Sequence, residues 1–399
     1  MPTIPCMHQP NYKTTAARTA AIGLASLAAA MGIGRFGFTP LLPLMQEAFG
    51  LTLNQGAWLA TANYLGYLVG ATASFLLNPR AGISARWGLL AVAVSTTATG
   101  MTAGFEAWFV LRFVSGIGSA FVLIGASSWA LAHLAAKSGS PASGWVFSGV
   151  GVGVFVAGIV ALIAGIVQAD PAHAWVLLGG LCAAVAVAAW SPLSIVAAGA
   201  QAQEVHAKAA PALERSEWTL VACYGVFGFG YILPATFIPA AARALVNDPA
   251  VFGWTWPVFG LAAAASTAVV STFFRTSPPR RVAAWSLVVM AAGVIAPVIR
   301  MSVGSLVVSA LCVGGTFMVM TMAGAQEARR IAVGSPTRLM AALTAAFAIG
   351  QTAGPVLVGF ASATGHALAI ASGLAVVLLL LSAVVLFLTE TRGPRVVTP

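Results

Sequence analysis

The sequence predicts an all-α membrane protein with 12 transmembrane helices in two parallel six-helix bundles. Three observations support this prediction. Of the 399 residues, 59% are hydrophobic and only 7% are charged, whereas about 25% of the residues in a soluble globular protein are charged. Long charge-free intervals recur along the chain, and two motifs repeat at an offset of about half its length. The composition excludes a soluble enzyme, which needs more polar surface, and a disordered chain, which is far less hydrophobic.

The charge-free intervals define the spans in order. A transmembrane helix needs about 20 mostly apolar residues, since each residue rises about 1.5 Å through a hydrocarbon core of roughly 30 Å. The first predicted span, 19–46, is apolar except for Arg35. Ten charge-free intervals follow: 48–79, 87–105, 113–136, 138–169, 171–203, 218–242, 249–274, 282–299, 301–326 and 339–389. The last interval breaks at the turn-forming residues Thr364, Gly365 and His366, so we expect it to fold as two helices.

The polar segments set the predicted domain boundaries. We expect a disordered cytoplasmic lead at 1–16, and no cleaved signal peptide, because the first ten residues are polar or turn-forming and the apolar segment after them is too long. The remaining predicted units are an amino-terminal bundle at 17–196, a cytoplasmic linker loop at 197–217, a carboxy-terminal bundle at 218–390 and a cytoplasmic tail at 391–399.

Basic residues predict the orientation, since short cytoplasmic loops are enriched in Lys and Arg. If the amino terminus is inside, the inside segments hold all but four of the 19 Lys and Arg residues: Arg35, Arg112, Arg243 and Arg300. Both termini are therefore expected in the cytoplasm, and the excess of Arg over Lys favours a bacterial inner membrane. The net charge of +10 is spread over short loops and not gathered on one face, so no nucleic-acid partner is expected.

Two motifs indicate an internal repeat. FGFTPLLP at 36–43 and FGFGYILP at 227–234 both read FGFxxxxP. Glycines also share one spacing in the fifth and eleventh spans: Gly149, Gly153 and Gly158, and Gly350, Gly354 and Gly359. Both matches pair a span with the span six later, which predicts two parallel halves. We interpret Gly149, Gly153, Gly350 and Gly354, with Pro355, as helix contacts or bends used when the halves rock.

Taken together, these features resemble the major facilitator superfamily (MFS) of secondary transporters. RFVSGIGSA at 112–120 looks like the fourth-helix signature of that superfamily. Three longer segments resemble its YbfB/YjiJ-type branch, often labelled sugar or arabinose efflux permeases: MGIGRFGFTPLLPLM at 31–45, YGVFGFGYILPATFIPA at 224–240 and AIGQTAGPVLVGF at 348–360. One departure stands out. The loop between helices two and three, 74–88, has Asn78 and no acidic residue, where the superfamily usually has an aspartate, so the usual charged cytoplasmic gate is in doubt.

Two arginines lie within predicted spans, where a charged side chain is costly and usually faces a protein interior or an aqueous cavity. Arg35 lies roughly 24 Å of helix beyond Arg18, too deep to reach the cytoplasmic face, and we expect it to face the central cavity. For Arg112 two interpretations stay open: a place in the same cavity, or an outward-reaching side chain paired with Glu106. In the superfamily the first and fourth helices line the cavity, so the resemblance implies that the two arginines are neighbours.

Substrate recognition is expected at these arginines. No Asp or Glu is predicted near the middle of a span, and buried positive charge without a buried carboxylate favours an anionic ligand, because guanidinium offers a bidentate fork for carboxylate. Tyr67 and Tyr224 are polar residues within spans, and most such groups only join helices. The predicted binding set is Arg35, alone or with Arg112, together with Asn63, Tyr64, Tyr231 and Gln351. Glu327 and His133, near inner helix ends, are candidates for proton coupling, although structural roles are commoner for such residues.

The sequence therefore favours a secondary active transporter that moves a small organic anion or metabolite by alternating access. A multidrug or sugar efflux permease of the same fold is the alternative. From a different class, a membrane-embedded enzyme or sensor would need a catalytic cluster or a soluble output domain. The four cysteines form no CxxC pair, so we expect neither a metal nor a cofactor. The expected partners are the small-molecule substrate, the lipid bilayer and a co-transported proton or exchanged anion, and the chain is expected to be a monomer.

Overall fold

The computed structural model describes residues 15–135, 142–195, 212–245, 253–361 and 367–389, and within these ranges every regular element is a helix. The predicted tail and most of the predicted lead and linker loop lie outside the described residues. Ten of the described helices are long and apolar enough to cross a membrane. The prediction of an all-α, multi-pass membrane protein is confirmed.

The first span consists of three helical pieces in series. The α-helix α1 (Ala16–Leu27) leads into a π-helical segment, η1 (Ala28–Arg35), and then into α2 (Phe38–Phe49). The sequence explains why this span is interrupted, because glycine adds backbone freedom and proline removes a backbone N–H. Both residue types cluster in the second half of the span: Gly32, Gly34, Gly37, Pro40 and Pro43.

Eleven further long helices complete the two halves. The amino-terminal half continues with α3 (Leu53–Leu77), α4 (Ala81–Met101), α5 (Phe105–Ala135), α6 (Ala142–Ile166) and α7 (Pro171–Trp190), followed by the short 3-10 helix η2 (Pro192–Ser194). The carboxy-terminal half contains α9 (Arg215–Leu245), α11 (Thr255–Phe273), α12 (Pro279–Ile299), α13 (Val303–Ile331), α14 (Pro336–Ala361) and α15 (Ala367–Leu388). α9 begins inside the range predicted for the linker loop.

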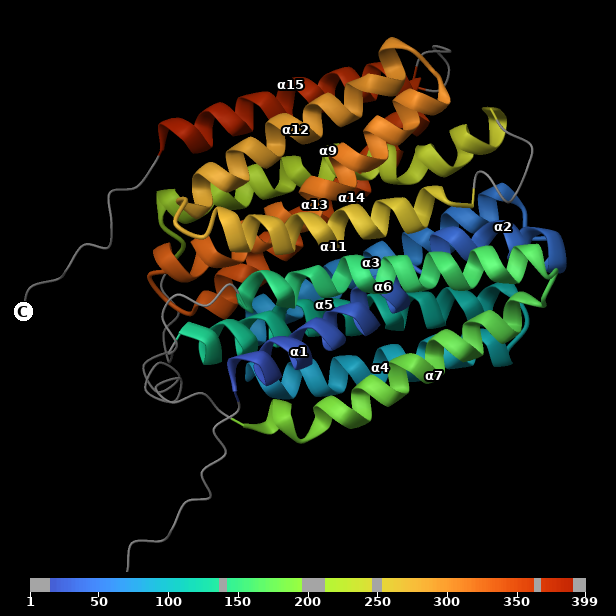
Figure 1. The fold of residues 1–399 in the computed structure, drawn as a ribbon, viewed down its shortest axis with the longest axis horizontal. Helices are drawn as coiled ribbons and strands as arrows, with labels where there is room; N and C mark the ends of the chain where they lie inside the picture. Colours follow the sequence, from blue (N-terminus) through green and yellow to red (C-terminus); the bar gives the residue numbers. More distant parts are fainter. Residues whose placement is uncertain (1–14, 136–141, 196–211, 246–252, 362–366, 390–399) are drawn as a thin grey trace, which may run out of the picture.

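The ten most apolar spans do not include α3 and α4. Their lengths of 25 and 21 residues are sufficient to cross a bilayer, but polar side chains lower their mean hydropathy. Counting α1, η1 and α2 as one span, the described residues contain the 12 predicted spans. We call the end at which α1 begins and α15 ends the terminal end; in Figure 1 it lies on the left.

The two halves lie side by side with their helices running along one common direction (Figure 1). α6 packs along α11, and α3 packs along α14. Small residues allow the first of these contacts to be close. A Cβ atom on Gly151 of α6 would lie 2.3 Å from the backbone nitrogen of Ala264, and one on Gly260 of α11 would lie 2.4 Å from that of Phe155. The interface between the halves is therefore built by close backbone approach.

The repeat predicted from glycine spacing is visible in the packing. On α6, Cβ atoms at Gly149 and Gly153 would each lie 2.1 Å from a carbonyl oxygen of the first span. On α14, a Cβ at Gly350 would lie 1.9 Å from Gly225 O of α9, and one at Gly354 would lie 2.4 Å from an Ile232 methyl carbon. Thus the fifth span packs on the first as the eleventh packs on the seventh. Pro355 follows within α14, and the part of these residues in rocking stays a prediction.

Candidate functional site

The candidate site is centred on the break in the first span, which lies at Phe36 and Gly37 between η1 and α2. The Phe36 N–H donates to Met31 O, five residues back, at 3.0 Å, which is the π-helical pattern. The Thr39 N–H bonds to Phe36 O at 3.3 Å, and Pro40 has no N–H. Carbonyl oxygens just before the break therefore need donors from outside the helix.

Arg112 of α5 supplies those donors. Its Nη1 donates to Gly34 O at 2.8 Å and its Nη2 donates to Arg35 O at 2.9 Å. The Ser115 hydroxyl adds a second bond to Gly34 O at 3.1 Å. Asn63 of α3 fixes the same place, because its Nδ2 donates to the backbone oxygen of Arg112 at 3.0 Å. Three spans are thus joined at the break.

The Arg112 side chain does not reach outward, and its place in a solute cavity stays a prediction. Its side chain is only 3% exposed and lies against the first span, with its guanidinium carbon 4.8 Å from the ring centroid of Phe38. Glu106, the partner considered for an outward-reaching side chain, is exposed in the first turn of α5. Because both Nη atoms bind backbone carbonyls, Arg112 holds the shape of the break directly.

Arg35, the last residue of η1, is enclosed between the two halves. It is 2% exposed, and its Nη2 donates to Oε1 of Gln351 on α14. Its guanidinium carbon lies 3.6 Å from the ring centroid of Tyr67 and 5.6 Å from that of Tyr64, both on α3. The structure therefore brings together Arg35, Tyr64 and Gln351, three members of the predicted binding set, from spans one, two and eleven.

Several polar atoms at this place are buried without a partner. In the part of the chain that the structure describes, no acceptor lies at hydrogen-bond distance from Nε or Nη1 of Arg35 or from Nε2 of Gln351. Oδ1 of Asn63 likewise has no donor there. Buried polar groups are usually paired, so three orphaned donors on two bonded residues are a place where an acceptor-rich group can bind.

An aromatic cluster adjoins Arg35 on the carboxy-terminal side. Tyr231 of α9, another predicted binding residue, is 1% exposed and stacks on Phe317 of α13 with the centroids 4.4 Å apart. Phe36, next to Arg35 in the chain, reaches this cluster: its centroid lies 5.6 Å from that of Phe317 and 6.4 Å from that of Tyr231. The polar donors thus border a largely aromatic surface.

Two contact residues have no place in the predicted binding set. Tyr67 makes the shortest ring contact with Arg35, and a signal for it exists: it lies three residues after Tyr64, which puts both rings on one helix face. Phe317 is a buried aromatic residue in an apolar helix, and no sequence signal separates such a residue from ordinary core packing.

The two predicted coupling residues lie elsewhere, in the last turns of their helices at the terminal end. Glu327 of α13 is fully buried, with Oε1 3.2 Å from Nε of Arg280 and Oε2 2.9 Å from Nε of Arg330. His133 of α5 is half-buried, with Nδ1 2.8 Å from Trp129 O. None of these contacts of Glu327 and His133 involves Arg35 or the residues that contact it.

The halves also touch at the terminal end, through the loop that lacks the usual aspartate. Asn78 ends α3 in a left-handed conformation with φ of 42°, and its Oδ1 accepts a hydrogen bond from Ser335 at 3.2 Å. The guanidinium carbon of Arg338 on α14 lies 4.4 Å from the ring centroid of Phe75. In the described residues, an uncharged hydrogen bond and a cation–π contact thus join the halves where a charged gate was in doubt.

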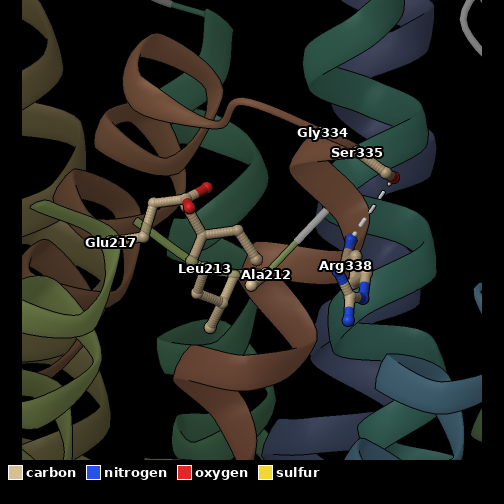
Figure 2. Close-up of a pocket in the computed structure, with 7 residues that line it drawn as sticks. Ala212, Leu213, Glu217, Gly334, Ser335 and Arg338 are labelled. Carbon is tan, nitrogen blue, oxygen red and sulfur yellow. Dashed lines mark hydrogen bonds between the residues drawn. The ribbon is translucent and has the colours of Figure 1, made fainter. Parts of the chain in front are cut away.

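A small pocket lies beside this contact (Figure 2). Arg338 and Ser335 border it on one side and Glu217 of α9 on the other. Its volume of about 10 Å³ is close to the minimum for one water molecule. The Glu217 carboxylate is already occupied, since it accepts from the backbone N–H of Glu214 at 2.7 Å and from that of Val333 at 3.3 Å. This pocket is too small for a solute.

Acidic, histidine and cysteine side chains do not gather elsewhere in the described ranges: no group of three or more there could hold a metal ion. The described site therefore consists of arginine, amide, hydroxyl and aromatic groups. Groups of these kinds can bind and orient a ligand.

Comparisons with known proteins agree with this architecture. A family model described as an uncharacterised MFS-type transporter YbfB matches residues 27–387. The chain is 34% identical over 97 residues to YceJ of Bacillus subtilis (strain 168), described as an uncharacterized MFS-type transporter. That match covers 23% of this chain and 24% of YceJ, so the chain aligns with about a quarter of that relative. The human organic anion transporter MFSD10 (TETRAN) has a similar structure, with a TM-score of 0.67 at 16% identity.

The structural match covers 95% of this chain and all of MFSD10, and at this identity it shows the shared fold. The family model covers most of the chain. The resemblance seen in the sequence is confirmed, and the protein is a transporter and not an enzyme. The chain belongs to the YbfB-type family of the major facilitator superfamily, the secondary transporters of solutes.

Proposed function

We propose that this transporter carries a small organic anion by alternating access, and that Arg35 binds the negatively charged end of the solute. The observation that carries the proposal is the set of buried donors, Nε and Nη1 of Arg35 and Nε2 of Gln351, which have no acceptor in the described residues. A carboxylate would supply both the missing acceptors and the missing negative charge.

In this proposal Arg112 and Asn63 position Arg35 rather than bind the solute. Arg112 gives both Nη atoms to backbone carbonyls of the break, and one of those carbonyls belongs to Arg35 itself. Asn63 in turn holds the backbone of Arg112. The orientation of the Arg35 side chain therefore depends on three spans that meet at one point.

The aromatic residues form the apolar part of the proposed site. Tyr64 and Tyr67 lie against the guanidinium on one side, while Tyr231 borders it on the other through Phe36. An arginine beside apolar surface suits a solute with one anionic group and a nonpolar body.

A sugar or multidrug efflux permease is the alternative within this fold. A cationic drug would be expected to meet a buried carboxylate. The two buried carboxylates in the described residues, Glu217 and Glu327, are both bonded at the terminal end. A sugar needs acceptors as well as donors, whereas three of the orphaned atoms at this place are donors and one, Oδ1 of Asn63, is an acceptor. Both observations favour an anion.

The proposed location is a bacterial inner membrane, with the terminal end in the cytoplasm. Described arginines at helix ends and in the connections gather at the terminal end, as with Arg80, Arg215 and Arg281, whereas Arg300 lies at the opposite end, as the positive-inside rule requires. Moving an anion inward costs about 2.3 kcal/mol per charge per 100 mV. Import would therefore require exchange or a co-transported proton, for which Glu327 and His133 remain the candidates.

Thermal unfolding of the purified protein tests the proposal. The probes are four carboxylates (acetate, lactate, succinate and benzoate), two sugars (glucose and arabinose) and the cation tetraphenylphosphonium. We expect at least one carboxylate to raise the Tm of the wild type and to have no effect on Arg35→Gln, because that variant lacks the charge and most of the donor fork.

The matched control is Arg18→Gln, which removes an exposed arginine from the same span and should respond to carboxylates like the wild type. Arg35→Lys keeps the charge without the fork and should give an intermediate response. Stabilisation by sugars or by the cation, without stabilisation by any carboxylate, would contradict the proposal.

A further inference from the structure

Gln351 forms a hydrogen bond with Arg35 that joins the two halves of the molecule. Its Oε1 accepts a hydrogen bond from Arg35, and the two residues belong to different halves, Arg35 to the first span and Gln351 to α14. Gln351 is fully buried. Its backbone is fixed, because a Cβ at the neighbouring Gly350 would already lie 1.9 Å from Gly225 O of α9. The amide is therefore held in position to meet the guanidinium.

The bond uses only part of what each side chain can offer. Arg35 keeps Nε and Nη1, and Gln351 keeps Nε2, without an acceptor in the described residues. A carboxylate that enters here would compete with Oε1 for the guanidinium, and it would win, since it carries the opposite charge and can accept two parallel hydrogen bonds from the guanidinium. The amide Nε2 could then turn toward the carboxylate as a donor.

We propose that Gln351 is an internal, uncharged substitute for the carboxylate of the solute. This inference rests on the proposed function. Gln351 holds Arg35 while no anion is bound, so the two halves can close on one another without cargo. An anion takes over the same contact and brings its charge across.

The reason lies in the cost of a buried, unpaired guanidinium. A carrier that closes on Arg35 with no acceptor from the other half would bury the charged guanidinium without any side-chain hydrogen bond across the halves, so the empty carrier would rarely change conformation. Such a carrier could only exchange one anion for another. With Gln351 in place, the empty carrier returns, and net transport in one direction becomes possible.

Two substitutions separate these roles. Gln351→Leu removes the acceptor and keeps a similar size. Net uptake should fall about tenfold more than exchange, since a lost partner for a buried charged donor costs roughly one to two factors of ten. Gln351→Glu supplies a permanent carboxylate. It should lose both activities and unfold at a Tm at least equal to that of the wild type, with no further stabilisation by carboxylates.

Gln326 of α13 offers a matched control. Its Nε2 donates to the Ser143 hydroxyl of α6 at 3.2 Å, so it also joins the two halves through an uncharged bond, away from Arg35. Gln326→Leu should keep the wild-type ratio of net uptake to exchange. This comparison distinguishes the loss of an acceptor for Arg35 from the loss of a hydrogen bond between the halves.

The experiment measures two fluxes in proteoliposomes with radiolabelled acetate, lactate, succinate and benzoate. One is uptake into empty vesicles, and the other is uptake into vesicles preloaded with the same unlabelled carboxylate. An unchanged ratio in Gln351→Leu overturns the inference while leaving an anion carrier in place. If that variant does not fold, Gln351→Glu decides, because net uptake or carboxylate stabilisation in it overturns the inference. If the wild type binds and moves none of the four, the proposed function fails as well.

Discussion

The first and seventh spans are two copies of one repeated segment, and they differ in how their centres are built. Both contain FGFxxxxP, at 36–43 and at 227–234. In the first span this motif follows the π-helical segment η1 and contains the break before α2, whereas α9 runs as one helix from Arg215 to Leu245. The scaffold is shared, but the chemistry at its centre is not.

The repeat itself shows which residues make the difference. Aligned on the motif, Arg35 corresponds to Val226, and Pro40 corresponds to Tyr231. The first span therefore carries a charge and a missing N–H where the seventh carries an apolar side chain and an aromatic ring. Tyr231 packs in the aromatic cluster, while the break beside Arg35 recruits Arg112.

Because of this difference, the two halves contribute different chemical groups to the candidate site. The amino-terminal half supplies a fixed positive charge, and the carboxy-terminal half supplies an aromatic wall and the amide of Gln351. A solute recognised at such a site must contact both halves to satisfy both surfaces. Contact of this kind couples binding to the relative movement of the halves.

Removing Arg112 should have the largest effect on stability, because it supports the break that distinguishes the first span from the seventh. Arg112→Leu leaves Arg35 O without its 2.9 Å partner, and it leaves Gly34 O with the Ser115 hydroxyl as its side-chain donor. Because an orphaned buried carbonyl costs about 1–3 kcal/mol and a lost hydrogen bond about 1 kcal/mol, we expect the free energy of unfolding to fall by about 2–4 kcal/mol. Carboxylate stabilisation should also disappear, since Arg35 loses its backbone support.

Unfolding of the detergent-solubilised protein by a denaturant checks this effect. Arg18→Leu is the control, because Arg18 is exposed near the start of the same span, and its loss should change stability little. Equal stability of the two variants would show that the break holds its shape without Arg112.

The fold follows from the sequence because its signals are additive along the chain. Apolar length gives the spans, basic loops give the expected orientation, and FGFxxxxP gives the repeat. A bilayer leaves few alternatives to helices whose backbone groups are paired internally. The predicted spans and the fold class were confirmed for this reason.

The site was predicted only in part, since residues on different spans meet through tertiary packing. The buried charge of Arg35 indicated a functional position on physical grounds. Its bond with Gln351, 316 residues away, had no local signal. Arg112 allowed two interpretations, because a sequence does not show which carbonyls a helix break leaves open.

Substituting Tyr67 tests the aromatic contacts of Arg35, with a smaller expected effect. Tyr67→Leu removes the ring that lies 3.6 Å from the guanidinium carbon of Arg35, and a desolvated cation–π contact is worth about 2 kcal/mol. We expect a loss of stability of about 1–2 kcal/mol and a weaker response to carboxylates. Tyr64→Leu, at 5.6 Å, should have less effect in the same unfolding assay. A larger loss of stability in Tyr64→Leu than in Tyr67→Leu would show that Tyr64, and not Tyr67, makes the stronger cation–π contact with Arg35.

Pro40→Ala gives the smallest expected effect and makes the first span more like the seventh. The new N–H at position 40 would donate to Phe36 O, four residues back. This would release the Thr39 N–H, which now bonds Phe36 O, to donate to Arg35 O, the carbonyl that Arg112 now serves. In the wild-type background that oxygen is already bonded, so stability should change little. In Arg112→Leu the same substitution should restore about 1 kcal/mol, because one orphaned carbonyl regains a donor.

A double-mutant cycle isolates this coupling between positions 40 and 112. Pro43→Ala is the control, since its new N–H would lie one turn further along α2, toward Thr39 O, which Arg112 does not contact. The two prolines differ only in which carbonyl they leave open. A coupling energy at position 40 and additivity at position 43 would therefore show that Arg112 replaces the missing proline N–H, and equal values would show that it does not.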